Sequence, residues 1–270
     1  MDVQITPLRI STTTVTSNWG MPIQLDVLFE QLKQQLIPIG YPAEGILKYE
    51  HKKEVHGACH KDLFTNRKAT DKPFYNQSTL VLRRPFGDGF KEVNMKLFGN
   101  GGIQMTGVPS NEFASHAVDW LLSVIKGLSR SPFATTTALP TAMKVDTSLI
   151  NTDYSLNYDI QQDNLHRLFI EKYNLFSMLE KTIYQGVNTK FFYNTNNKNT
   201  GVCSCTGGAF CKGQGNGDGN GECKRITMSI FRTGKIIITG ARTMEQIQAA
   251  YEFLNKVFRE HAATVLIKRA

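Results

Sequence analysis

The stretch that decides the fold is Arg225-Ile-Thr-Met-Ser-Ile-Phe-Arg-Thr-Gly-Lys-Ile-Ile-Ile-Thr-Gly240, together with the helical pattern that follows it to Phe258. The first half of the chain holds a related stretch, Asn94-Met-Lys-Leu-Phe-Gly-Asn-Gly-Gly-Ile-Gln-Met-Thr-Gly107, which continues to Ile125. Aligned without a gap, residues 94–125 and 227–258 are identical at 10 of 32 positions, whereas unrelated segments would share roughly 2. The sequence therefore predicts a tandem repeat.

Each copy opens with two runs of alternating apolar and polar residues that meet at a glycine, which is typical of two strands in a tight hairpin. An amphipathic helix pattern follows each hairpin, with Ser110 and Thr243 as the expected N-caps. This helix would cover one face of the hairpin and leave the other face open. In the second copy the expected core face holds Met228, Ile230, Ile236 and Ile238. The open faces are polar except for Phe98, Phe231 and Ile237.

Composition and charge narrow the class of protein. The chain has 270 residues, enough for one large or two ordinary domains. Lys and Arg number 31 against 23 Asp and Glu, and the net charge of +8 favours a polyanion partner but also fits a merely basic soluble protein. There is no run of about 18 apolar residues and no N-terminal signal pattern, and an odd number of cysteines, 5, fits a reducing compartment. We therefore expect an intracellular protein without a membrane span.

The repeat also predicts the domain organisation. We expect an N-terminal repeat over residues 1–128 with an insert at about 51–90, a linker over 129–142, and a C-terminal repeat over 143–270 with an insert at about 194–223. Each half should run strand, helix, strand, insert, strand, strand, helix, which gives an α+β fold of one antiparallel sheet with its helices on one side. Outside the two copies the expected strands are 8–20, 44–50, 78–82 and 185–193, and the expected helices are 26–36 and 163–183.

The segment Ile230-Phe-Arg-Thr-Gly-Lys-Ile-Ile-Ile-Thr-Gly-Ala241 resembles the Ile-Phe-x-x-Gly-Lys-x-x-x-Thr-Gly-Ala signature of the TATA-box-binding protein family. The resemblance extends in order over about residues 8–260, and the long inserts make the chain similar to divergent members encoded by large DNA viruses. It implies a pseudo-twofold saddle of two repeats, in which a curved antiparallel sheet carries helices on its convex face. The concave face of the family lies on the DNA minor groove, where phenylalanines insert between base steps and kink the duplex.

The resemblance also implies which residues contact DNA. Phe98 and Phe231 match inserting positions, and Lys235 and Arg242 match basic positions that contact the DNA backbone. The remaining residues match positions that face the floor of the groove. The full set of implied DNA-binding residues is Thr12, Thr14, Phe98, Gln104, Thr106, Thr147, Leu149, Phe231, Lys235, Ile237, Thr239 and Arg242.

The chain departs from the family pattern at several functional positions. The family's second inserting Phe in each half has no clear counterpart, because the expected strands begin at Gly45 and Gly186, and Phe176 is a substitute to consider. Thr12 and Thr147 replace two central asparagines, and a hydroxyl has less donor capacity than an amide. Gly102 replaces the signature lysine in the first half. The first half is therefore expected to be the weaker DNA surface, so asymmetric, altered or lost DNA binding stays open.

The second insert is a glycine-rich loop with four cysteines, Cys203, Cys205, Cys211 and Cys223. Four thiolates are enough for a closed tetrahedral zinc site, although the spacing is not that of paired Cys-x2-Cys knuckles. Zinc is thus the expected cofactor if there is one, and a loop with free thiols and a set of disulfides are the alternatives. The first insert holds His56, Cys59 and His60, for which surface histidines are a simpler explanation than a second metal site.

We predict that the protein is a general transcription initiation factor that binds and bends A·T-rich promoter DNA through the minor groove and helps to recruit RNA polymerase. Its expected partners are promoter DNA, a B-type initiation factor and the polymerase. It would act as a monomer or homodimer in the nucleus or a viral replication and transcription compartment, with packaging in the virion as a further location. No enzyme activity is expected, since no nucleophile–base pair or phosphate-binding loop stands out.

Two alternatives stay open. The protein could be a protein-interaction or assembly module that kept the fold and lost or altered its TATA binding. It could also be an accessory domain of a nucleic-acid enzyme, although the two repeats occupy the whole chain and leave no room for a catalytic domain. Salt-sensitive affinity for DNA would separate the first alternative from the main prediction.

Overall fold

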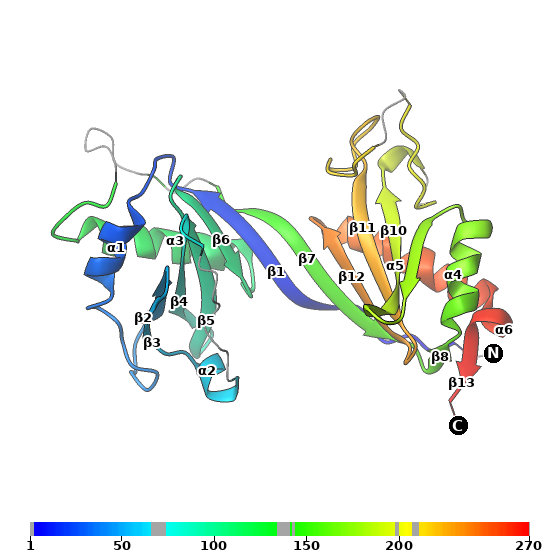
Figure 1. Cartoon of the computed structure of the whole chain (residues 1–270), viewed down its shortest axis with the longest axis horizontal. Helices are drawn as coiled ribbons and strands as arrows, with labels where there is room; N and C mark the ends of the chain where they lie inside the picture. The colour runs from blue at the N-terminus through cyan, green and yellow to red at the C-terminus, as the bar shows by residue number, and fades with distance from the viewer. Residues whose placement is uncertain are drawn as a thin grey trace. The chain divides into compact units, whose positions relative to one another are not determined.

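The computed structural model describes residues 3–65, 74–133, 141, 144–197, 200–206 and 211–269 (Figure 1). The chain divides into two compact units. The N-terminal unit is Thr13–Ser148, and the C-terminal unit is Met1–Thr12 together with Leu149–Ala270. The opening residues of the chain therefore lie with the second half. Of the expected linker over 129–142, residues 134–140 and 142 are outside the described residues, and the predicted domain boundaries stay predictions.

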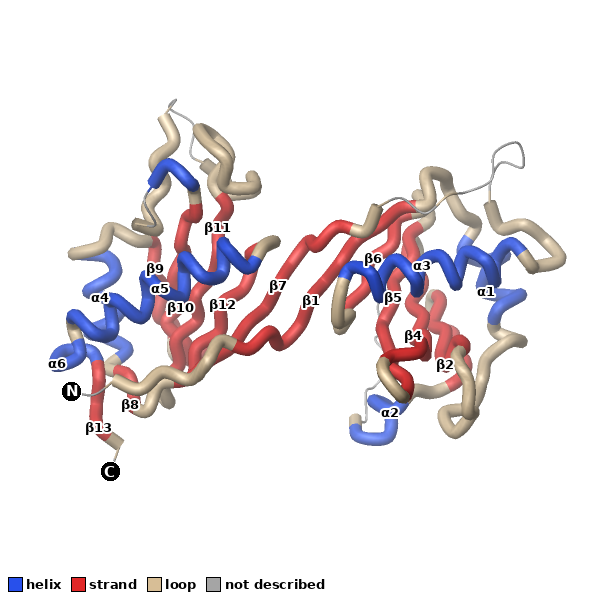
Figure 2. Tube along the Cα trace, turned by 180° about the vertical axis from the view of Figure 1, so that it is seen from behind, coloured by secondary structure: helices blue, strands red, loops and turns tan. Residues whose placement is uncertain are grey.

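The C-terminal unit is an antiparallel sheet with the strand order β7-β12-β11-β10-β9, and β8 pairs separately with β13. Figure 2 shows α5 lying across one face of this sheet, where it contacts β10, β11 and β12. The elements of the unit are β7 (Asp146–Ser155), β8 (Tyr158–Ile160), α4 (Gln162–Glu171), β9 (Phe176–Glu180), β10 (Tyr184–Tyr193), η1 (Thr195–Asn197), β11 (Lys224–Phe231), β12 (Lys235–Ala241), α5 (Met244–Glu260), α6 (Ala262–Val265) and β13 (Leu266–Lys268).

The N-terminal unit is an antiparallel sheet with the strand order β3-β2-β4-β5-β6-β1. Helix α3 lies across one face of β5 and β6 as α5 does in the other unit (Figure 2). The elements are β1 (Arg9–Asn18), α1 (Leu25–Leu32), β2 (Gly45–His51), β3 (Glu54–Gly57), α2 (His60–Phe64), β4 (Gln77–Phe86), β5 (Gly89–Phe98), β6 (Gly102–Thr106) and α3 (Asn111–Lys126).

Each unit has its own hydrophobic core between its sheet and its helices. In the C-terminal unit every second residue of the β11–β12 hairpin is buried, including Met228 and Ile236, and these side chains pack against Leu254 of α5. In the N-terminal unit Met95 and Ile103 pack against α3 in the same way. Burial of alternate residues on one face is what the period of two predicts for a strand with one covered side. The predicted α+β class with helices on one face of antiparallel sheet is thereby confirmed.

Local signals explain where the hairpins and helices begin and end. The β11–β12 hairpin turns at Gly234, whose φ of 72° suits glycine and whose missing Cβ would lie 2.2 Å from the Tyr158 carbonyl oxygen. The side chains of Ser110 and Thr243 accept hydrogen bonds from the backbone three residues later, so both predicted N-caps are confirmed. The two copies also pair in one register, since Asn94 lies opposite Thr106 and Thr227 lies opposite Thr239.

Two sequence predictions about elements are wrong. The helix expected over 163–183 ends at Glu171, because Asn174 adopts a φ of 51° and the chain then forms strand β9. The strands at 44–50 and 185–193 are not equivalent in position, because the neighbour of β5 is β4, whereas the neighbour of β11 is β10. The strand expected over 78–82 is therefore β4, the counterpart of β10, and it is longer than predicted. Among the described helices none has the length and apolar character to cross a membrane.

Candidate nucleic-acid interface and candidate metal centre

The open face of the C-terminal sheet lies opposite its helices. Cross-strand partners point to the same side of a sheet, so the pairs Thr227–Thr239 and Ser229–Ile237 share this face. Lys190 of β10 lies opposite Thr227 and donates a hydrogen bond to its hydroxyl at 2.9 Å. The predicted residues Ile237 and Thr239 therefore lie side by side with a lysine that the sequence did not single out.

An aromatic pair occupies one end of this open face. The ring centroids of Phe231 and Tyr184 are 5.6 Å apart, and the rings meet edge to face. Gly186 lies directly opposite Phe231, and a Cβ there would come within 3.2 Å of the Phe231 ring and 2.9 Å of the Tyr184 ring. The two rings thus fill the space above a glycine, and Tyr184 stays 41% exposed.

Sequence reasoning missed Tyr184 because it began the strand at Gly186, whereas β10 begins at Tyr184. The proposed substitute, Phe176, lies opposite Lys190 on β9. That position is four residues along β10 from Gly186, or about 13 Å at the usual strand rise. Tyr184 is therefore the aromatic neighbour of Phe231, and Phe176 is a separate, 58% exposed side chain.

Positive charges gather near the other end of the same strands. Burial lowers the pKa of Lys190, and the charge of Arg225 lowers it further. Burial, followed by the charges of Arg242 and Arg225, also lowers the pKa of Lys224. In the described part of the chain none of these four cations has a carboxylate within ion-pairing distance. An uncompensated cation cluster of this kind favours an anionic partner.

The open face of the N-terminal sheet has the same plan with different side chains. Thr106 of β6 lies between Thr14 and Asn94, and Gln104 lies between Thr16 and Lys96. The predicted residues Thr14, Gln104 and Thr106 are thus adjacent, and Thr14 is buried. Lys96 supplies a central cation where the signature lysine is missing.

Phe98 lies at the end of this face, opposite Gln77 of β4. Gln77 therefore stands where Gly186 stands in the other unit, and Tyr75, two residues earlier, corresponds in register to Tyr184. Tyr75 is 69% exposed. Sequence reasoning missed it because β4 was treated as an extra strand.

The other predicted contact residues lie on β1, on β7, and at the two ends of β12. Thr12 and Leu149 are half-buried residues of the C-terminal unit, while Thr147 belongs to the N-terminal unit and donates a hydrogen bond to Asn111. Thr239 donates a hydrogen bond to Asn151 of β7, an amide that the sequence analysis did not identify. Lys235 is exposed at the start of β12, and Arg242 is exposed just after its end.

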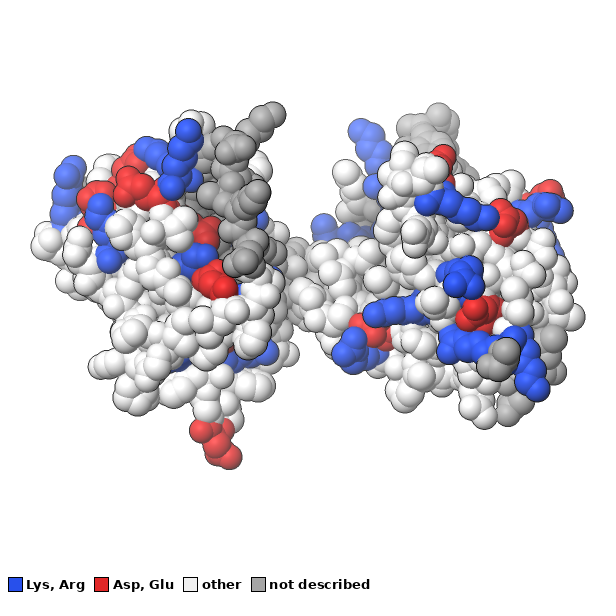
Figure 3. Space-filling model, turned by 60° about the horizontal axis from the view of Figure 1, so that its bottom comes forward, with Lys and Arg blue, Asp and Glu red and all other residues white. Residues whose placement is uncertain are grey.

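Basic and acidic side chains are interspersed on the surface that Figure 3 shows, rather than gathered in one single-sign patch. The net charge therefore does not locate a binding surface by itself. The open sheet faces are better defined by their register, their aromatic residues and the cations named above.

A serine, a histidine and an aspartate are aligned in the N-terminal unit. The Ser78 hydroxyl lies 2.8 Å from His51 Nδ1, and His51 Nε2 lies 3.0 Å from Asp26 Oδ1. Ser78 is only 1% exposed and His51 is buried as well. A nucleophile must reach its substrate, and Ser78 and His51 are buried although Asp26 is exposed. This chain of hydrogen bonds therefore ties α1, β2 and β4 together.

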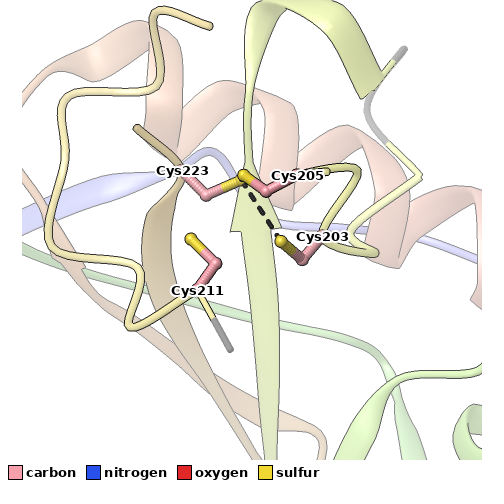
Figure 4. A group of neighbouring side chains, drawn as sticks. All are labelled: Cys203, Cys205, Cys211 and Cys223. Atoms are coloured by element: carbon pink, nitrogen blue, oxygen red, sulfur yellow. Dashed lines mark hydrogen bonds between the residues drawn. The ribbon is translucent and has the colours of Figure 1, made fainter. Parts of the chain in front are cut away.

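The four cysteines of the second insert form a compact cluster, in which all four sulfur atoms lie within 4.8 Å of one another. Figure 4 shows the side chains pointing toward one another, with Cys223 Sγ 3.3 Å from Cys205 Sγ and 3.7 Å from Cys203 Sγ. The hydrogen bond with Cys223 lowers the pKa of Cys205 to about 7, while burial raises the pKa of Cys223 to about 12. The structure thus joins the predicted ligands Cys203, Cys205, Cys211 and Cys223 in one place.

The residues His56, Cys59 and His60 do not form a comparable group. The Cys59 thiol hydrogen-bonds to Asp62, and His60 pairs with Glu92. Within the described ranges, the four-cysteine cluster is the one set of three or more Cys, His or acidic side chains arranged to hold a metal ion.

Comparisons with known proteins show what the chain is similar to. The family described as "Transcription factor TFIID (or TATA-binding protein, TBP)" matches residues 221–261, which include the stretch that decides the fold. The "TATA-box-binding protein-like" protein of Acanthamoeba polyphaga mimivirus is 28% identical over 281 residues, covering 96% of this chain and 67% of that protein. Among solved structures, Methanococcus jannaschii TBP is 15% identical with a TM-score of 0.49, covering 94% of this chain and 99% of that chain.

The fold defines an α+β protein that is built from two units, each with a sheet and helices on one face of it. The uncovered face of each sheet carries aromatic and basic residues. Within that class, the chain is similar to the TATA-box-binding protein family over residues 221–261, and to a viral TATA-box-binding protein-like protein over nearly its whole length.

Proposed function

We propose that the protein is a transcription initiation factor that binds A·T-rich promoter DNA through the minor groove and bends it. The observation that carries the proposal is the edge-to-face pair of Phe231 and Tyr184 at the end of an open, polar sheet face. A rigid pair of partly exposed rings over a glycine is suited to wedge between base steps. Flexible A·T steps favour such a protein because they cost less to unstack and bend.

The cations of the C-terminal unit have a defined part in this proposal. Lys190 lies on the open face itself, while Arg225 and Arg242 are exposed near the ends of the strands. Their contacts with phosphates would release counterions and make the affinity fall with salt. The N-terminal unit would contribute Phe98, with Tyr75 as its counterpart of Tyr184.

The remaining elements of the proposal follow from the family. Promoter DNA, a B-type initiation factor and an RNA polymerase are the proposed partners, and the protein would act as a monomer or homodimer. A nucleus or a viral transcription compartment, or a virion that carries its own transcription apparatus, is the proposed location. The viral relative supports a viral setting.

The test is a salt-titrated binding and bending assay on two labelled duplexes, one A·T-rich and one G·C-rich. Loss of an aromatic that stacks on a base costs roughly 1–3 kcal/mol, so Phe231→Ala should weaken binding to the A·T-rich duplex about fivefold or more and reduce the bend. Ile170→Ala is the control, because Ile170 is an exposed apolar residue of helix α4 and not of the open sheet face. Weak, sequence-independent binding that neither variant changes would refute the proposal.

One alternative function has its own observation. Strand β9 ends the strand order of the C-terminal sheet, and its exposed residues include Phe176 and Met178. An edge strand with exposed apolar side chains is suited to pair with another protein. If the protein is an assembly module, it should show no salt-sensitive DNA affinity, and Phe176→Asp should abolish a self-association that sedimentation detects in the wild type.

A further inference from the structure

We propose that Cys203, Cys205, Cys211 and Cys223 bind one zinc ion, which fixes the second insert against the C-terminal sheet. The distances carry this inference. A zinc ion with four thiolate ligands at about 2.3 Å requires sulfur–sulfur separations of about 3.8 Å. The cluster has separations of 3.3 and 3.7 Å, with all four sulfurs inside 4.8 Å, so a small adjustment of the side chains suffices.

The arrangement fits a metal centre better than disulfides. A disulfide joins two sulfurs at about 2.05 Å and leaves them without a shared centre, whereas Cys223 is close to two other cysteines at once. The backbone N–H of Gly221 also donates to Cys205 Sγ at 3.1 Å, and the Asn194 amide lies 3.5 Å from Cys223 Sγ. Donors of this kind compensate the negative charge of metal-bound thiolates. On binding zinc, each thiol would release its proton to solvent.

The composition of the insert makes it costly to order, and a bound metal would offset part of that cost. Residues 211–223 include many glycines, which lose the most conformational entropy when they are ordered. Gly217, with a φ of 98°, lies against the Tyr193 ring, and a Cβ there would approach that ring to 2.4 Å. The loop is therefore shaped to follow the end of β10. In the described part of the insert the Asn220 amide joins two segments through hydrogen bonds with the Thr206 backbone, and Cys203, Cys205, Cys211 and Cys223 join these segments at a second point.

The position of the insert gives the metal a consequence for the open face. Asn216 accepts a hydrogen bond from Arg242 at 2.7 Å and, through its backbone carbonyl, one from Gln246 at 2.7 Å. The insert thus holds the cation that follows β12 and the first turn of α5. This consequence rests on the proposed function, because Arg242 matters here only if it contacts the DNA backbone.

Metal analysis of the full chain, purified without added metal or chelator, tests the zinc site directly. We expect one zinc per chain in the wild type and in Cys59→Ser, which removes the one cysteine outside the cluster. Cys211→Ser should lose the metal, and this residue is suitable because it is only half-buried, whereas loss of the buried Cys223 could prevent folding. Replacement by cobalt in the wild type should give the absorption of a tetrahedral thiolate complex, which needs no variant.

Several outcomes would overturn the zinc site. They are a wild type without stoichiometric metal, a protein that binds iron instead, and a Cys211→Ser variant that retains zinc as well as Cys59→Ser does. DNA binding is measured separately on the same samples. Stoichiometric zinc in a protein without DNA affinity would refute the proposed function and leave the proposed metal site standing. DNA affinity in a protein without zinc would refute the metal site and leave the proposed function standing.

Discussion

Adjacent isoleucines on β12 test which face of the C-terminal sheet is open. Ile236 is fully buried against the helices. Ile237 points to the other face of the sheet, where it is half-buried and pairs across the strands with Ser229. Truncating a buried isoleucine to alanine typically costs about 2–5 kcal/mol because it removes apolar contacts and leaves a cavity. Ile236→Ala should therefore lower the free energy of unfolding by that amount, while Ile237→Ala should lower it by less than about 1 kcal/mol.

In DNA binding, Ile237→Ala should have the larger effect and Ile236→Ala the smaller one. Ile237→Ala removes apolar surface that the groove would cover, and we expect roughly a tenfold weaker affinity for the A·T-rich duplex. Ile236→Ala should bind normally at temperatures where it is folded. Urea unfolding followed by circular dichroism gives the stabilities, and fluorescence anisotropy gives the affinities. Equal destabilisation by the two variants would refute the assignment of faces, because a one-residue change of register exchanges them.

Three further predictions concern the turn, the pH dependence and the insert. Gly234→Ala should destabilise the protein by more than about 1 kcal/mol, because a Cβ would lie 2.2 Å from a backbone carbonyl oxygen at a φ of 72°; an unchanged urea midpoint would contradict this. The hydrogen bond from Lys52 is the largest influence that lowers the pKa of Asp26 below its usual value of 3.8. The ionised Asp26 carboxylate therefore stabilises the fold above pH 3.8, and this stabilisation is lost as the pH falls through the lowered pKa of Asp26. Asp26→Asn should flatten the decline of the urea midpoint in acid, and parallel curves for variant and wild type would count against the pairing. Asn216→Ala should weaken DNA binding severalfold with a smaller salt dependence, because Arg242 loses its fixed position, and zinc content should not change.

Local patterns in the sequence predicted the parts of the fold that depend on neighbouring residues. Alternation of apolar residues around Gly234 predicted the hairpin and its buried face, and the hydroxyls of Ser110 and Thr243 predicted where the helices begin. The signals that failed were those that depend on tertiary structure. Strand β5 pairs with β4 and not with β2, and the residue compositions of β2 and β4 do not indicate which of the two is its neighbour.

The site was predicted unevenly for the same reason. Phe231 carried a signature, but its neighbour Tyr184 could be found only from the register that places Gly186 opposite Phe231. The cluster of cysteines could be anticipated from their number, whereas their approach within 4.8 Å depends on how the insert folds back on itself. The hydrogen bond between Asn216 and Arg242 had no signal in the sequence at all.

The two open faces differ most in how their cations are used. In the N-terminal unit Lys48 contacts both Glu50 and Asp62, and although burial works to lower the pKa of Lys48, these hydrogen bonds raise it overall. Arg83 of the same unit lies opposite Glu92, with the two charged groups 3.8 Å apart. These charges are already neutralised, so a phosphate would have to displace a carboxylate to reach them. Lys96 is the cation of this face that has no carboxylate partner among the described residues.

In the C-terminal unit the cation cluster around Lys190 lacks carboxylate partners among the described residues. Burial and the nearby charge of Arg225 lower the pKa of Lys190, and no carboxylate of the described residues is placed to pair with either side chain. An arriving phosphate would relieve this repulsion instead of competing with an existing partner. The favourable electrostatic part of DNA binding should therefore come mainly from the C-terminal unit. The same unit holds the observed aromatic pair and the cysteine cluster. We therefore expect the C-terminal unit to provide most of the binding energy, the bending of the DNA and the metal-dependent ordering of the second insert.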